Sequence, residues 1–311
     1  IGGEMGNSSA STLDDVSRYF AHLNRLGLNT VLAPVSWELI EPQEGVFDMS
    51  TVDNLLTEAR KNDLKVVVLW FGAWKNSMSC YAPEWFKRDT KRFPRAHTMD
   101  GMPVEEASSL SKNVLEADKK AFCKIMEYLR DNDKEQTVVM VQVENEYGSY
   151  DTDKEYIRAI RDIVKESGFD NTVLFQCDWS SNFTNNGLDD LLWTMNFGTG
   201  ANIDSQFSHL KELRPRTPLM CSEFWSGWFD KWGARHETRP AQDMVNGIDE
   251  MLSKGISFSL YMTHGGTSFG HWAGANSPGF APAVTSYDYD APINEDGSAT
   301  EAYYRLAPSR L

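Results

Sequence analysis

Residues 137–147 read TVVMVQVENEY, an almost unbroken apolar run that ends in two glutamates and a tyrosine. Near-continuous apolar runs are typical of strands that are covered on both faces, as in parallel sheets. In a barrel of parallel strands, the functional side chains gather where the strands end. This segment therefore predicts a buried parallel strand with candidate functional residues at its carboxyl end.

Seven other segments have the same strand-like character, and helical patterns lie between them. The strand-like segments are residues 1–5, 29–37, 65–74, 172–179, 191–197, 217–225 and 256–264. The helical patterns cover residues 13–26, 52–62, 114–132, 154–167 and 242–254, and a last helix is expected from about Thr300. Eight strands that alternate with helices predict an α/β protein with a closed (β/α)₈ TIM barrel. We expect a single catalytic barrel over residues 1–311 without accessory β-domains. A doubly wound open sheet is the rival, but no G-x-G-x-x-G fingerprint follows any strand.

Composition narrows the possible partners. The 311 residues are 41% hydrophobic and 24% charged, which is typical of a globular protein, and the net charge is −15. An acidic surface repels phosphate backbones and anionic lipid, so we expect neither a nucleic acid nor a membrane partner. The longest apolar run, residues 66–74, is far shorter than the roughly 20 residues that span a bilayer. No basic and apolar leader precedes Ile1, as expected of a mature or trimmed chain. Neutral ligands remain, and the ten tryptophans either stack on such a ligand or fill a large core.

Carboxylates at two strand ends are the candidates for chemistry. Strand alternation places Glu144 and Glu146 on one face and Asn145 on the other. Two close carboxylates repel each other, so one of them takes a raised pKa, which favours a functional role for the pair. The alternative interpretation is that both glutamates belong to a solvated acidic rim. Glu223 ends a second apolar segment, LMCSEFW at 219–225, among aromatic residues. Two carboxylates on different strands form the pair that glycoside cleavage requires.

Three other sequence patterns offer alternative sites. Residues 255–287 contain no charged side chain, which is typical either of buried packing or of a pocket wall for a neutral ligand. GTSFG at 266–270 matches the nucleophile elbow of serine hydrolases, but a loop follows it where a helix is required. The six histidines lack metal-ligand spacing and the four cysteines form no C-x-x-C pair, so we expect no metal site and free, buried thiols. His236 and Glu237 are interpreted as a charged surface pair.

Five segments carry a resemblance to a known family. VQVENEYGSY at 141–150 resembles the acid/base strand of the β-galactosidases of glycoside hydrolase family 35. The resemblance continues through residues 196–203, 222–239, 260–278 and 285–297. It implies a retaining glycosidase with a (β/α)₈ barrel, no metal or organic cofactor, a neutral carbohydrate substrate and a periplasmic or secreted location.

The resemblance also implies roles for individual residues. Glu146 would be the acid/base and Glu223 the nucleophile. Further contacts with the sugar or the catalytic pair are implied for Glu144, Asn145, Trp225, Tyr261 and Tyr289. In a retaining enzyme the two catalytic carboxyl groups are expected about 5–5.5 Å apart. The aromatic residues between 261 and 289 should then line the same cleft.

The first third of the chain departs from the family pattern. Pro34 stands where the family has a tyrosine, GGEMGNSS at 2–9 replaces its usual opening, and LWFGAWKNSMS at 69–79 replaces a segment that grips galactose. Such changes are typical of a divergent branch or of an engineered recombinant of two relatives. A β-galactosidase is favoured. The alternatives are a β-glucosidase, β-mannosidase or β-arabinosidase whose Lys75-Asn76-Ser77 selects another hydroxyl pattern, or a catalytically silent sugar-binding barrel.

Overall fold

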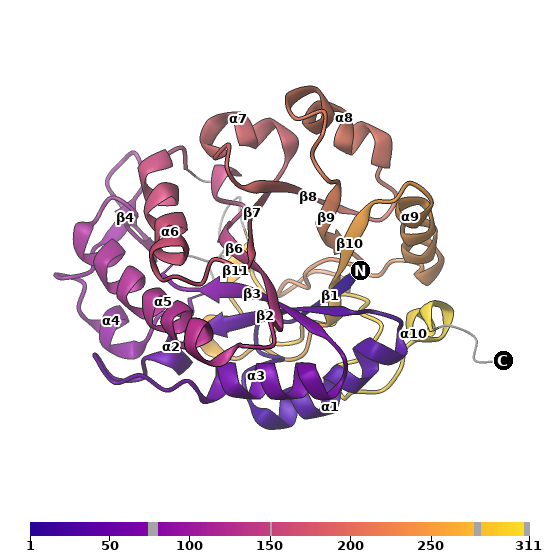
Figure 1. Ribbon diagram of the computed structural model, residues 1–311, viewed down its shortest axis with the longest axis horizontal. Helices are drawn as coiled ribbons and strands as arrows, with labels where there is room; N and C mark the ends of the chain where they lie inside the picture. The colour runs from indigo at the N-terminus through magenta and orange to yellow at the C-terminus, as the bar shows by residue number, and fades with distance from the viewer. Residues whose placement is uncertain (74–79, 150, 277–280, 308–311) are drawn as a thin grey trace.

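The protein is a closed barrel of eight parallel strands, as the sequence predicted (Figure 1). The computed structural model describes residues 1–73, 80–149, 151–276 and 281–307. Around the barrel the strands follow the order β1-β10-β9-β8-β7-β6-β3-β2, and β2 pairs with β1 to close the ring. The strands are β1 (Gly2–Met5), β2 (Thr30–Ser36), β3 (Lys65–Phe71), β6 (Val138–Asn145), β7 (Val173–Asp178), β8 (Leu192–Gly198), β9 (Met220–Trp225) and β10 (Ser257–His264).

Helices cover the outside of the barrel. The longer ones are α1 (Leu13–Arg25), α3 (Ser50–Lys61), α5 (Lys112–Asn132), α6 (Lys154–Glu166), α8 (Ile203–Leu213) and α9 (Ala241–Ser253), and shorter ones are α2 (Trp37–Ile40), α4 (Glu84–Arg88), α7 (Phe183–Asn186) and α10 (Glu301–Leu306). In α1, Thr12 and Asp15 cap the first turn reciprocally, and the helix buries an apolar stripe that includes Val16, Phe20 and Leu23. Within the described residues, no helix has the length and apolarity needed to cross a membrane.

Two small antiparallel sheets interrupt the alternation of strands and helices. The β4 (Arg95–His97) and β5 (Pro103–Ala107) hairpin lies in the crossover from β3 to β6. The β11 (Ala275–Asn276) and β12 (Ala281–Pro282) pair follows β10, within the uncharged stretch. The sequence predicted neither sheet, and both contribute residues to the cleft described below.

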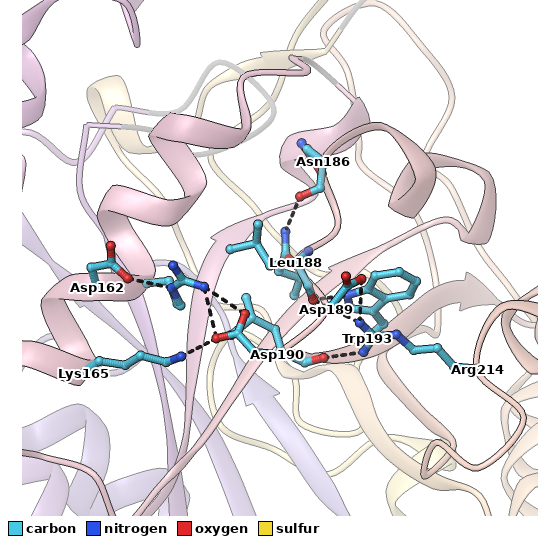
Figure 2. Close-up of polar contacts among 11 residues, drawn as sticks. Asp162, Lys165, Asn186, Leu188, Asp189, Asp190, Trp193 and Arg214 are labelled. Carbon is cyan, nitrogen blue, oxygen red and sulfur yellow. Dashed lines mark hydrogen bonds and ion pairs between the residues drawn. The ribbon is translucent and has the colours of Figure 1, made fainter.

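A polar cluster fixes the start of β8 at the amino-terminal end of this strand (Figure 2). Asp190 accepts hydrogen bonds from Arg161 and Lys165 of α6. Arg214, which follows α8, donates to two backbone carbonyls just before β8 and lies 3.5 Å from the centre of the Trp193 ring. These contacts tie β8 to helices on both of its sides. They support the strand that carries Asn196, a residue central to the site.

The cysteines are free thiols in the described part of the chain. Cys177 and Cys221 are buried in the barrel, while Cys80 and Cys123 are half-buried, so the expectation of buried thiols holds for two of the four. Burial raises the pKa of the Cys177 and Cys221 thiols well above the ordinary value, which keeps both protonated.

Candidate active site

A cleft of about 750 Å³ opens at the carboxyl ends of the strands. It brings together five of the residues proposed from the sequence: Glu146, Glu223, Trp225, Tyr261 and Tyr289. Trp228 and Phe229 also line it. Tyr261, Ala275 and Asn276 of the uncharged stretch line it too, so part of that stretch does form a wall beside the two glutamates. The size is that of a typical ligand pocket.

Glu146 follows the last residue of β6 and is almost completely buried, with 7% of its surface exposed. Its backbone adopts a left-handed conformation, with a φ of 49°. This conformation is uncommon for a residue with a side chain and is typical of functional sites. The Asn196 amide in β8 donates a 2.8 Å hydrogen bond to Glu146 Oε1. The carboxyl group is therefore held from the strand two positions away in the barrel.

Glu223 lies within β9 and is 5% exposed. The indole Nε1 of Trp225 donates a 3.0 Å hydrogen bond to Glu223 Oε2. The Glu223 backbone N–H donates to Asn196 Oδ1 at 3.1 Å. A donor on one carboxylate oxygen restricts the rotamer of the side chain.

Asn196 connects the two glutamates, although sequence analysis did not single it out. Its side chain is fully buried between them. The Nδ2 group binds the Glu146 carboxylate, while Oδ1 accepts from Ser222 Oγ at 2.8 Å and from the Glu223 backbone. The only sequence signal was its place at the start of the NFGTGANI segment. A single amide therefore joins β8 to the carboxylate that follows β6 and to β9 at the site.

The expectation that Glu144 and Glu146 share one face of a regular strand is wrong. The register shifts between Gln142 and Asn145, and Glu144 has a φ of 58°, so alternation fails where the two glutamates lie. Glu144 Oε1 accepts a 2.8 Å hydrogen bond from the Tyr156 hydroxyl of α6. The Asn145 side chain is buried and its Oδ1 accepts from Gln142. Of the described residues, those that line the cleft include neither Glu144 nor Asn145.

Three buried tyrosines form the aromatic side of the site. The hydroxyls of Tyr261 and Tyr287 share a hydrogen bond, and the rings of Tyr287 and Tyr289 stack with centroids 5.4 Å apart. Burial raises the pKa of all three phenols well above the usual value, and the nearby Glu223 charge adds to the effect. The Glu146 charge also contributes at Tyr289. All three hydroxyls therefore stay protonated at neutral pH and can donate hydrogen bonds.

His236 is more than the surface pair with Glu237 that the sequence indicated. Its Nδ1 lies 2.6 Å from Asp230 Oδ2, and its Nε2 lies 3.4 Å from Asp288 Oδ2. The hydrogen bond to Asp230 and the charges of both aspartates raise the pKa of His236. Because Asp288 directly precedes Tyr289, the imidazole joins the loop after β9 to the turn that carries this tyrosine. Its two aspartate partners lie 6 and 52 positions away in the chain, so sequence spacing did not indicate these ion pairs.

Two sequence proposals are not addressed by this geometry. Lys75, Asn76 and Ser77, proposed to select the sugar, lie outside the described residues. The separation of the Glu146 and Glu223 carboxyl groups, expected at about 5–5.5 Å, stays a prediction.

No cluster of three potential ligands able to hold a metal ion occurs in the part of the chain that the structure describes.

The fold and the paired carboxylates define the class: a (β/α)₈ barrel with a glycosidase-type site. The family model "Glycosyl hydrolases family 35" matches residues 11–308, a span that includes most of the divergent first third. The chain therefore belongs to glycosyl hydrolase family 35, as the resemblance implied.

Individual relatives agree with this assignment. The chain is 35% identical to a "Beta-galactosidase-1-like protein" of Mus musculus over 90% of its length and 43% of the relative. It is 35% identical to a β-galactosidase of Xanthomonas manihotis over 89% of its length and 46% of the relative. The human β-galactosidase is 44% identical over 54% of this chain and 25% of its own. The chain thus spans less than half the length of these relatives.

A solved structure supports the fold alone. Endo-glycoceramidase II from Rhodococcus sp., in a complex with a cellobiose-like imidazole, superposes with a TM-score of 0.62 at 15% identity. The superposition covers 98% of this chain and 77% of that one. At this identity the likeness extends to the barrel and not to the substrate.

Proposed function

We propose that the protein is a retaining, exo-acting β-glycosidase, most specifically a β-galactosidase that removes terminal, non-reducing β-linked galactose. The observation that carries the proposal is the pairing of Glu146 and Glu223 in one cleft, with Asn196 bound to both strands. The names of the relatives support galactose as the sugar. The net charge of −15 supports a neutral carbohydrate substrate.

In the first step, Glu146 acts as the general acid and Glu223 as the nucleophile. The Glu223 carboxylate attacks the anomeric carbon while Glu146 transfers its proton to the glycosidic oxygen, and the aglycone leaves. The Trp225 indole donates to Glu223 Oε2 at 3.0 Å and so orients the carboxylate for the attack. The product is a covalent glycosyl-enzyme with inverted configuration at the anomeric carbon.

In the second step the roles reverse. Glu146, now a carboxylate, removes a proton from a water molecule that attacks the same carbon, and Glu223 leaves. A second inversion restores the β configuration. The Asn196 amide donates to Glu146 in this ionised state, so it supports the base form directly. Tyr261 and Tyr289, which line the cleft beside Glu223, would donate hydrogen bonds to the sugar.

Turnover of a panel of nitrophenyl β-glycosides tests the activity and the choice of sugar. We expect the β-galactoside to give the highest kcat/KM. A preference for glucose, mannose or arabinose would keep the mechanism and change the specificity. The absence of turnover on every sugar would indicate a silent sugar-binding barrel and contradict the proposal.

Two alanine variants test the roles of the carboxylates. Glu223→Ala should abolish turnover, and added azide should restore cleavage with inverted product, because the small anion can attack from the vacated space. Glu146→Ala should still cleave substrates whose leaving group needs no proton, then stall at the glycosyl-enzyme until azide replaces water. Equal losses on all leaving groups, with no response to azide in either variant, would show that the roles are wrongly assigned.

A further inference from the structure

The cleft has a second wall that the catalytic residues do not explain. Strand β9 supplies Glu223, strand β10 supplies Tyr261, and the loop after β10 supplies Tyr289, which together form the aromatic side. The opposite side comes from the loops after β3, β6 and β7. These three strands are neighbours in the barrel (Figure 1), and residues from the segments after all three line the cleft.

We call this surface the aglycone wall. It consists of the cleft-lining residues of the β4–β5 hairpin and the segment after it, of the segment that follows β6, and of Trp179 directly after β7: residues 96, 97, 104, 106–110, 147, 149, 151 and 179. Its outer part is open to solvent. Trp179 is 47% exposed and Leu110 is 81% exposed, whereas Tyr261 and Tyr289 are 5% and 3% exposed.

The position of the general acid decides which part of a substrate meets this wall. A glycosidase acid gives its proton to the oxygen that joins the sugar to the leaving group, so the leaving group lies on the side of the acid. Glu146 immediately precedes the part of the aglycone wall that follows β6. The buried, tyrosine-lined side beside Glu223 then receives the sugar that is released, and the open side receives the aglycone.

Trp179 has a rigid backbone beneath an exposed ring. The backbone N–H of Trp179 donates to the buried Asp178 carboxylate at 2.9 Å. The same oxygen accepts from Ser149 Oγ at 2.9 Å and from Asn182 Nδ2 at 2.8 Å. This network fixes the loop after β7 against the segment after Glu146. A tryptophan whose backbone is held in this way presents a flat apolar face at a reduced conformational cost.

Polar groups accompany the ring. Ser109 Oγ donates to Asp151 Oδ2 at 3.1 Å, which connects the segment after the hairpin to the segment after β6. His97, Glu106 and Ser108 line the same side of the cleft and provide donors and acceptors. An apolar platform with a few convergent polar groups is typical of a site for a neutral, partly polar ligand, and a sugar ring has both an apolar face and hydroxyl groups.

We propose that the aglycone wall is a binding subsite for a neutral sugar ring, which stacks on Trp179 while its hydroxyls bind the hairpin residues. The substrate would then be a galactosyl oligosaccharide and not a galactoside of a small alcohol. This inference rests on the proposed function, because it takes Glu146 as the acid. Tyr147 and Ser149 of this wall fall within a segment that carries the family resemblance, whereas its other residues, Trp179 included, lie outside those segments.

The test compares two substrates that differ only in the leaving group. β-Galactosyl fluoride has no ring to stack, whereas galactose linked β-1,3, β-1,4 or β-1,6 to glucose has one. For the disaccharide that the parent protein cleaves best, Trp179→Ala should lower the ratio of its kcat/KM to that of the fluoride by about tenfold or more, as expected when a stacked indole is lost. Trp179→Phe should recover part of the ratio. Trp232→Ala is the matched control, since Trp232 is 72% exposed and does not line the cleft, and it should leave both values unchanged.

A binding measurement separates this inference from the proposed function. In the Glu223→Gln background, the disaccharide should bind more tightly than galactose, and Trp179→Ala should remove that difference. An unchanged ratio in Trp179→Ala, with normal turnover of the fluoride, would overturn the aglycone wall and leave the proposed function intact. Tryptophan-dependent binding of the disaccharide without turnover of any substrate by the parent would overturn the function and retain the subsite.

Discussion

Replacing Asn196 with alanine should damage both stability and catalysis, because one amide holds both catalytic strands. The substitution removes a hydrogen bond to the Glu146 carboxylate and two bonds that Oδ1 accepts from β9. A bond to a charged group contributes about 1.5–3 kcal/mol and a neutral one about 1 kcal/mol. We expect the free energy of unfolding to fall by about 3 kcal/mol, since the contributions are not fully additive.

The catalytic effect should depend on the leaving group. Without the amide, Glu146 loses its position relative to the glycosidic oxygen, and a well-placed general acid contributes about 10²–10⁴-fold. We expect kcat/KM to fall by about 10²-fold or more for an alkyl galactoside. The loss should be much smaller for a dinitrophenyl galactoside, whose leaving group needs no proton.

A control on the same strands separates the two effects. Thr194 and Ser222 share a 2.6 Å hydrogen bond between β8 and β9. Thr194→Val should cost about 1 kcal/mol in unfolding free energy and leave the dependence of kcat/KM on the leaving group unchanged. The same loss of activity on both leaving groups in Asn196→Ala, or a similar pattern in Thr194→Val, would refute the positioning role of Asn196.

Two further predictions concern the turn that carries Tyr289. The pKa of His236 is raised above the ordinary 6.5, so its ion pairs stabilise the fold fully below pH 6.5 and are lost as the pH rises through the folded-state pKa. His236→Asn should therefore lower thermal stability and raise KM near pH 6, and both differences should vanish at high pH. Thermal melts and kinetics across that pH range would show this. A Cβ added at Gly227 would lie 2.3 Å from the Tyr289 carbonyl oxygen, so Gly227→Ala should displace the turn and sharply reduce activity, whereas Gly198→Ala, whose nearest neighbour is 3.4 Å away, should be tolerated in the same assay.

The barrel could be predicted because its signals are local. Most barrel strands are apolar runs of the length that a buried strand needs, and glycines stop several helices. The sequence analysis missed α8, because its buried positions Ile203, Phe207 and Leu210 form a sparse stripe without a terminal glycine. The β4–β5 hairpin was also missed, since its residues follow no hydrophobic period.

The site was predictable only in part for a related reason. Glu146 and Glu223 stand at strand ends, so position and residue type together indicated them. Strand alternation failed at Glu144, because two left-handed residues and a shifted register reorient the chain at the end of β6. The role of Asn196 depends on contacts across three strands, which no local pattern records.

Trapping the glycosyl-enzyme tests the central claim most directly. 2-Deoxy-2-fluoro-β-galactosyl fluoride destabilises the transition states of both steps, but its good leaving group still allows the first, so a covalent intermediate should accumulate. Mass spectrometry of the digested protein should find one fluorosugar per chain, attached to Glu223. A label on another residue, or no label together with release of α-galactose as the first product from an ordinary galactoside, would contradict the account.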